Sequence, residues 1–303
     1  MCDTCGGHDE VTSRAVHPNA HSHSGGTRVV VVGKGGVGKS TLSAVLARQL
    51  ARGGWRVVAV DADEQRNLAA SLGMSLADSL SIVPVADDAE YVYEKTGARP
   101  GEGAGGLLIL NPDTTDVIDR LSVQAPDGVR LVVMGGVREA GRGCLCPETA
   151  LISSAVAGMH LHEEDVVVMD THAGVEHFGR ALARGFDTVV AVVEPTFNSV
   201  RVGVESAVLA RELGIGTVHL VINRVRTESD LGRVLGYLDQ LDAPQFNSVT
   251  QVPYDEMVLT NEPSVDALLE GSAMADAVGL LSTHVLASAN NVSAWVSSCV
   301  PLS

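Results

Sequence analysis

The stretch RVVVVGKGGVGKSTLSAVLARQLAR, residues 28–52, decides the fold of this chain. Its valine run predicts a buried strand at 28–32, and the pattern that follows predicts a helix over 39–52. The loop between them, Gly33–Ser40, satisfies G-x-x-x-x-G-K-[ST], in which backbone N–H groups surround phosphates, Lys39 reaches the β and γ oxygens and Ser40 offers its hydroxyl to Mg²⁺. We therefore expect a phosphate site formed by Gly33, Lys34, Gly35, Gly36, Val37, Gly38, Lys39, Ser40 and Thr41.

Apolar runs alternate with helical segments along the rest of the chain. Further strands are expected at 56–63, 106–110, 130–134, 164–170, 188–194 and 218–223. Helices are expected at 64–72, 147–158, 175–184, 199–213, 228–241 and 264–289, and 77–128 has weak periodicity. Strands that are apolar at every position are typical of sheets covered on both faces, which predicts an α/β fold with a doubly wound, mostly parallel sheet. We expect one domain over 27–290, a flexible tail over 1–26 and a C-terminal extension over 291–303.

Composition narrows the range of partners. The chain has 21 Lys and Arg against 37 Asp and Glu, a net charge of −16, and only 4 Phe, 4 Tyr and 2 Trp. Such a surface repels phosphate backbones and offers few platforms for base stacking, so nucleic acid is disfavoured as a partner. No apolar run reaches the ~20 residues of a membrane helix, and residues 1–26 lack the apolar region of a secretory signal. We expect a cytoplasmic protein that neither enters a membrane nor binds nucleic acid, with its five cysteines used for metal or redox chemistry rather than disulfides.

Carboxylates follow two of the expected strands. Asp61 and Asp63 end the second strand, and Asp170 ends the strand over 164–170. At the carboxyl edge of a parallel sheet such groups can hold the water shell of Mg²⁺ and orient the attacking water. We assign Asp63 to the water, and Asp61 and Asp170 to Mg²⁺ contacts partly through water. The alternative for each Asp alone is a helix cap.

Two further sequence features bear on which nucleotide is bound and on whether a second subunit takes part. Many GTP-binding proteins read guanine with the Asp of N-K-x-D, but here Asn223-Arg224-Val225-Arg226 ends in an Arg, which accepts no hydrogen bond. ATP is therefore favoured over GTP. Lys34 duplicates the charge of Lys39 within one loop, which a nucleotide held by a second subunit would explain. The alternative is a solvated loop lysine.

Cys144 and Cys146 form a C-x-C pair directly before a predicted helix. Thiols one residue apart are poor disulfide partners but reasonable ligands for Ni²⁺ or Zn²⁺. They supply two of four tetrahedral positions, and a two-fold dimer would supply the other two. A redox dithiol and two inert apolar residues remain alternatives. Further candidates are local hydrogen-bonding residues (His172, His177), a structural cysteine (Cys299), and tail ligands (Cys2, Cys5, His8, His17, His21, His23).

Five segments together resemble a known family. They are GKGGVGKS (33–40), DADEQRNL (61–68), MGGVREAGRGCLCPE (134–148), DTHAGVEHFGR (170–180) and VPYDE (252–256). Over about 27–290 the sequence resembles the CooC-type nickel-insertion ATPases that mature carbon monoxide dehydrogenase. These belong to the P-loop NTPases of the deviant Walker A (SIMIBI) class, which includes the Min, Par, arsenite-pump and nitrogenase iron-protein ATPases. The C-x-C-P-E segment separates the CooC type from these relatives.

The resemblance implies roles and partners for this chain. Lys34 would cross the dimer, Asp63 would help position the hydrolytic water, Cys144 and Cys146 would form the intersubunit metal site, and Asn223 and Pro253 would flank adenine. It implies ATP, Mg²⁺ and Ni²⁺ or Zn²⁺ as cofactors, a homodimer, and carbon monoxide dehydrogenase or a related nickel enzyme as client. The sequence departs from the family at Glu64, where proline is usual, at His172, where an acidic residue is usual, and in its His/Cys tail.

Two other functions found in the deviant Walker A class are alternatives to nickel insertion. A Min- or Par-type positioning ATPase would need a basic amphipathic C-terminal helix or a basic stripe, whereas residues 280–303 contain no Lys or Arg. An iron–sulfur reductase-like ATPase would hold a cluster with four cysteines of a dimer. In that class the two cysteines of each chain are usually well separated, and here both candidates share one loop.

Overall fold

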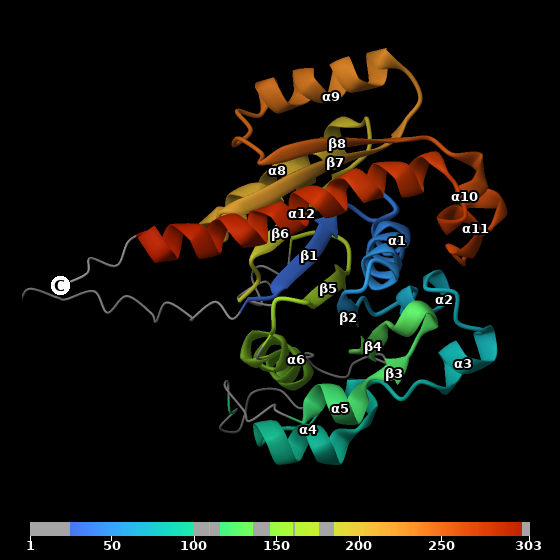
Figure 1. Cartoon of the computed structure of the whole chain (residues 1–303), viewed down its shortest axis with the longest axis vertical. Helices are drawn as coiled ribbons and strands as arrows, with labels where there is room; N and C mark the ends of the chain where they lie inside the picture. The colour runs from blue at the N-terminus through green and yellow to red at the C-terminus, as the bar shows by residue number, and fades with distance from the viewer. Residues whose placement is uncertain are drawn as a thin grey trace, which may run out of the picture.

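The computed structural model describes residues 25–99, 109, 116–135, 146–159, 161–175 and 185–298, with side chains for all of these except 146–150 and 288–298 (Figure 1). An eight-stranded sheet forms the centre, in the order β3-β4-β2-β5-β1-β6-β7-β8. Every neighbouring pair is parallel except β3 and β4. The predicted α/β class with a mostly parallel sheet is thus confirmed. The strands are β1 Thr27–Gly33, β2 Arg56–Ala62, β3 Val123–Gln124, β4 Arg130–Val133, β5 Asp165–Thr171, β6 Thr188–Val193, β7 Thr217–Val225 and β8 Ser248–Pro253.

Helices cover both faces of the sheet because the central strands are apolar at every position. In β1, Val29 and Val31 face one buried cluster and Val30 and Val32 face the other. The first cluster includes α1 Lys39–Arg52, α2 Leu68–Ser71, α11 Asp266–Leu269 and α12 Ala273–Ser298. The second includes α4 Ala89–Thr96, α5 Val117–Leu121, α6 Cys146–Gly158, α8 Phe197–Glu212 and α9 Glu228–Gln240. Figure 1 shows α12 crossing the strands beside α1, with α3 Leu76–Ser81 and α10 Glu256–Thr260 at the periphery.

Several element boundaries differ from the expectations. The helix expected at 264–289 is two helices, α11 and α12, separated at Gly271, whose φ of +142° interrupts helical geometry. The helix expected at 64–72 is shortened to α2, because Arg66 has a φ of +55°, which is outside helical geometry. The N–H of Leu68 at the start of α2 donates to Asp61. Strands β3 and β8 were not expected. The helix α12 continues across position 290 to Ser298, and the domain boundaries themselves stay predictions.

Two expected elements fall wholly or mostly outside the described residues. Of the strand expected at 106–110, only Ile109 is described, and it is not in a strand. Of the helix expected at 175–184, only Val175 is described.

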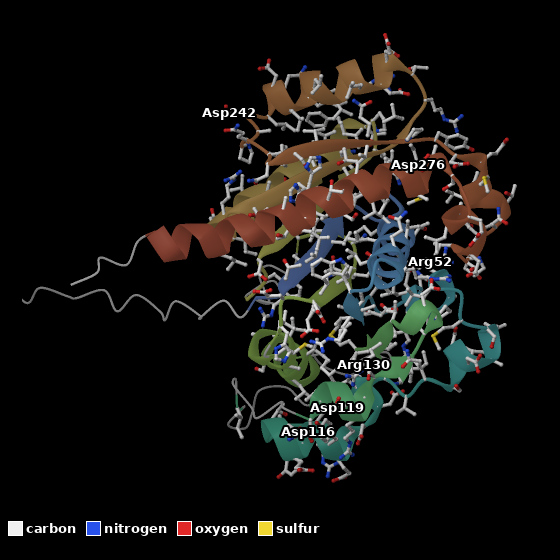
Figure 2. The ribbon with its side chains drawn as sticks, in the orientation of Figure 1. Arg52, Asp116, Asp119, Arg130, Asp242 and Asp276 are labelled. Carbon is white, nitrogen blue, oxygen red and sulfur yellow. The ribbon has the colours of Figure 1, made fainter. Side chains whose placement is uncertain are left out.

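The weakly periodic segment 77–128 forms α3, α4, α5, β3 and the short 3-10 helices η1 Val85–Asp87 and η2 Pro126–Gly128. Ion pairs tie this region to the sheet edge. Arg130 of β4 lies beside Asp119 of α5 (Figure 2), with Nη2 2.8 Å from Oδ1. Within the described part of the chain, no helix has the length and apolar character needed to cross a bilayer.

One buried histidine makes stability depend on pH. His219 of β7 is 1% exposed, its Nδ1 lies 2.7 Å from Ser248 Oγ, and its Nε2 has no hydrogen-bond partner in the described structure. Burial, with a smaller contribution from His284 of α12, lowers its pKa from 6.5 to about 4. The folded state therefore favours the neutral ring. The stabilisation that comes from keeping His219 neutral is complete above pH 6.5 and is lost as the pH falls toward 4.

We expect the free energy of unfolding to fall by about 2 kcal/mol more in the native chain than in His219→Gln between pH 7 and pH 4.5. Glutamine keeps a hydrogen-bonding group near Ser248 but does not titrate. Urea unfolding at both pH values measures the difference. Equal losses in both proteins would show that His219 is not the titrating group.

Candidate nucleotide site

The loop between β1 and α1 adopts a backbone that only glycine allows at two key positions. Gly33 has φ +149°, and a Cβ there would lie 2.3 Å from the backbone oxygen of Val192. Gly38, which precedes α1, has φ +94°, and a Cβ there would lie 2.6 Å from Asn223 Nδ2. No side chain caps the start of α1. The first N–H groups of this helix are therefore available to an anion, as the motif requires.

Lys39 is buried at the start of α1. Its Nζ donates to the backbone oxygen of Lys34 at 3.2 Å. Burial lowers the pKa of Lys39, and the charges of Asp170 and Asp63 act in the opposite direction. The ammonium group therefore lies in a poorly solvated position close to carboxylates, where an added phosphate would gain a strong charge interaction.

Asp170, the residue before the last in β5, is fully buried beside the loop. Its Oδ1 accepts from Ser43 Oγ at 3.3 Å, whereas its buried Oδ2 makes no hydrogen bond of acceptable geometry with the described residues. Burial raises the pKa of Asp170 to about 6, opposed by Ser40 and Lys39. A buried carboxylate oxygen without a partner next to the Ser40 hydroxyl fits Mg²⁺, which takes hard oxygen ligands and water.

Asp61 has a different set of partners from the one expected. Its Oδ1 accepts from the backbone N–H of Asp63 at 3.1 Å and its Oδ2 from that of Leu68 at 3.0 Å. Burial, followed by the charge of Asp170, raises the pKa of Asp61 to about 8. Both oxygens thus shape the loop between β2 and α2, as the helix-cap alternative anticipates, and a Mg²⁺ contact by Asp61 stays a prediction. Asp63 is partly exposed and accepts from the N–H of Gln65 at 2.9 Å.

A cavity of about 740 Å³ joins these elements, a size that suits a nucleotide. The predicted residues that line it are Gly35, Gly36, Gly38, Lys39, Ser40, Thr41, Asp63, Asn223 and Pro253, with His172 beside them. Gly33, Val37, Asp61 and Asp170 lie behind this lining. Lys34 does not line the cavity either, and its side chain makes no ion pair within the described structure, which leaves its amine available to another molecule.

The far end of the cavity is built from the carboxyl ends of β7 and β8. Asn223 Nδ2 donates to the backbone oxygen of Val37 at 2.7 Å, so this asparagine also supports the phosphate loop. Arg224 has φ +59° and pairs with Glu194 at 3.3 Å. The Arg226 guanidinium lies 3.5 Å from the centre of the Tyr254 ring, a cation–π contact on the cavity wall.

Sequence reasoning missed part of this lining. The additional polar and charged residues include Gln65, Asn67, Arg224, Tyr254, Asp255 and Glu262. Gln65 and Asn67 lie within the DADEQRNL motif, and Tyr254 and Asp255 lie within VPYDE, which begins in the last two residues of β8. The motifs thus marked these segments, but not which of their side chains reach the cavity.

Most of the cysteines and histidines that the sequence singles out lie outside the described residues. Cys144 is not described, and Cys146 is the first residue of α6 with its side chain not described. Cys2, Cys5, His8, His17, His21, His23, His177 and Cys299 are also outside. Within the ranges that are described, no three His, Cys, Asp or Glu side chains are placed to hold a metal ion. The thiolate site therefore stays a prediction.

Comparisons with known proteins agree with the geometry. A family model described as the CobQ/CobB/MinD/ParA nucleotide binding domain matches residues 29–264. The carbon monoxide dehydrogenase accessory protein CooC of Rhodospirillum rubrum is 36% identical over 231 residues, covering 76% of this chain and 85% of CooC. An ATP-binding protein of Methanocaldococcus jannaschii is 33% identical over 246 residues, covering 78% and 88%.

Solved structures show the same fold. The MinD cell division protein of Aquifex aeolicus has a TM-score of 0.56 at 20% identity, covering 91% of this chain and 99% of that one. A ParA family ATPase of Chlorobium tepidum has a TM-score of 0.58 at 18% identity, covering 86% and 100%. The relatives confirm the resemblance to the CooC type, and the chain belongs to the CobQ/CobB/MinD/ParA family of nucleotide-binding domains.

Proposed function

We propose that this chain is an ATP-hydrolysing metallochaperone that dimerises around ATP and inserts nickel into carbon monoxide dehydrogenase in the cytoplasm. The observation that carries the proposal is the cavity beneath the phosphate loop, in a chain 36% identical to an accessory protein of carbon monoxide dehydrogenase. The fold alone does not favour this function over a Min- or Par-type one.

Residues that line the cavity, together with Asp170 behind its wall, each have a separate role in the ATPase reaction. Backbone N–H groups of the loop and Lys39 bind the phosphates, Ser40 and Asp170 would hold Mg²⁺, and Asp63 orients the attacking water from its partly exposed position. When bound there, Mg²⁺ would supply positive charge that offsets the negative charge of the phosphates. Lys34 of one subunit reaches the nucleotide of its partner, and Asn223 and Pro253 flank the adenine.

The nickel site belongs to the dimer. Cys144 and Cys146 from two subunits supply four thiolates to one Ni²⁺ or Zn²⁺. ATP binding closes the dimer and completes this site, and hydrolysis opens it and releases nickel to the client. This coupling requires the metal to bind one state of the dimer more tightly than the other.

The test measures bound nickel per chain together with molar mass, with and without Mg-ATP. We expect one nickel per two chains, retained in Cys2→Ser/Cys5→Ser and lost in Cys144→Ser/Cys146→Ser. Two results would contradict the proposal and favour a positioning ATPase. One is loss of nickel in Cys2→Ser/Cys5→Ser, and the other is a dimer that forms equally well without ATP and without the C-x-C pair. Visible absorbance typical of an iron–sulfur cluster after anaerobic purification would instead favour the reductase-like alternative.

A further inference from the structure

The helix α3 exposes apolar side chains that the fold does not use. Leu76 and Leu80 lie one turn apart and are 73% and 77% exposed, and Val83, directly after the helix, is 62% exposed. No residue of α3 is buried, although Leu72 before it and Ile82 after it are. In Figure 1, α3 lies at the edge of the molecule. Clustered exposed apolar residues of this kind mark interaction surfaces more often than scattered ones do.

A groove of about 880 Å³ runs beside this helix. Its apolar lining residues are Met74, Ile82, Val83, Leu121 and Val123, the last of which belongs to the edge strand β3. Polar residues, among them Ser75, Asp78 and Gln124, also line the groove, and Leu76 and Leu80 lie outside it. The groove and the exposed leucines together thus offer a surface of mixed polar and apolar character on which a helix or an extended segment could bind.

Carboxylates outnumber cations around this surface, although Arg120 and Arg99 pair with two of them. Residues 73–94 contain five carboxylates, Asp78, Asp87, Asp88, Glu90 and Glu94, and no Lys or Arg. Arg120, which lines the groove, pairs with Asp88 at 3.1 Å. Charge complementarity therefore favours an apolar segment flanked by basic side chains, and it disfavours a second copy of this chain, whose net charge is −16.

Hydrogen bonds connect both ends of this segment to the nucleotide site. Before α3, the N–H of Leu68 is held by Asp61, and the backbone oxygen of Leu72 accepts from Arg48 of α1 at 3.1 Å. After α3, the N–H of Ala86 donates to Met134 at 3.0 Å, and the N–H of Met134 donates to the backbone oxygen of Asp61 at 2.9 Å.

Close packing also connects this segment to Gly135, the last residue described before position 146. Pro84 packs so closely on Gly135 that a Cβ there would lie 2.7 Å from the Pro84 Cβ. Gly135 follows Met134, and the chain continues from it to Cys144. A partner bound to α3 would thus lie beside Pro84 and Ala86. Ala86 is connected by hydrogen bonds through Met134 to Asp61, and Pro84 packs on Gly135.

We infer that α3 and the adjacent groove form the docking surface for the client enzyme, which presents an apolar segment flanked by basic residues. This inference rests on the proposed function, since it names where the recipient of nickel binds. The leucines supply affinity by burial, and the carboxylates supply orientation and salt dependence.

The test compares Leu76→Asp/Leu80→Asp with the matched pair Leu235→Asp/Leu280→Asp. Leu235 of α9 and Leu280 of α12 are 50% and 64% exposed, so neither pair disturbs the core. The probe is purified carbon monoxide dehydrogenase without nickel, and the Kd is measured with Mg-ATP at two ionic strengths. We expect the α3 pair to raise the Kd at least about 10-fold and the control pair less than about 2-fold, with weaker binding of the native chain at higher salt.

Each other outcome has a distinct meaning. If the native chain and both variants bind the client equally, the docking surface is wrong and nickel delivery stands. If the native chain does not bind the client in any nucleotide state, the proposed function fails and the inference fails with it. If the α3 pair instead abolishes the increase in molar mass with Mg-ATP, the surface belongs to the subunit interface and the inference is overturned.

Discussion

Replacing Arg48 with methionine is expected to lower the free energy of unfolding by about 3 kcal/mol, because the change removes a buried guanidinium together with the three hydrogen bonds that it donates. The Arg48 side chain, in α1, is 4% exposed. Its Nε donates to Asp127 at 2.6 Å, its Nη1 donates to the backbone oxygen of Leu72 at 3.1 Å, and it also bonds Asp266. One guanidinium therefore holds the phosphate-loop helix against three other segments, η2, the end of α2 and α11.

Arg52 provides the matched control one turn further along α1 (Figure 2). It donates to the same Asp127 at 2.9 Å, but its side chain is 39% exposed. Solvent screening makes such a pair worth little, so Arg52→Met should lose at most about 1 kcal/mol. Urea unfolding of the nucleotide-free chains measures both losses. Equal losses would show that the buried bonds of Arg48 contribute no more than a surface ion pair.

Local patterns allowed the central elements to be predicted. The helix expected at 39–52 coincides with α1, and the valine run lies within β1, because a strand buried on both faces leaves a continuous apolar signal. Strand β8 has no such signal. It lies at the edge of the sheet, where only alternate residues, Thr250 and Val252, are buried, so it lacks the continuous apolar run of β1.

The phosphate end of the site was predictable from one contiguous motif, but the base end was not. Arg224, Arg226 and Tyr254 meet there only because β7 and β8 are neighbours, and no local pattern encodes that pairing. The partners of Asp61 show the same limit. The sequence reveals a carboxylate at a strand end, whereas the folded loop decides that the N–H groups of Asp63 and Leu68 occupy both of its oxygens.

The two lysines of the phosphate loop should have different effects when each is replaced by alanine. Lys39 lines the cavity, so Lys39→Ala should weaken ATP binding and reduce hydrolysis by about 10³-fold. Lys34 does not line the cavity of its own chain, so Lys34→Ala should leave ATP binding to the monomer unchanged. If Lys34 acts on the partner's nucleotide, hydrolysis should still fall by about 10³-fold or more, as it does when a cation supplied in trans is removed.

Mixing the two inactive variants separates action across the dimer from action within one chain. In a mixed dimer, the Lys34→Ala subunit keeps Lys39 and binds ATP, and the Lys39→Ala subunit supplies an intact Lys34 to that nucleotide. Random pairing makes half of the dimers mixed, each with one of two sites complete, so about a quarter of the native rate should return. If Lys34 acts within its own chain, every site in the mixture lacks one lysine and no activity returns. Steady-state phosphate release after mixing therefore decides whether the second lysine of this loop belongs to the neighbouring subunit's site.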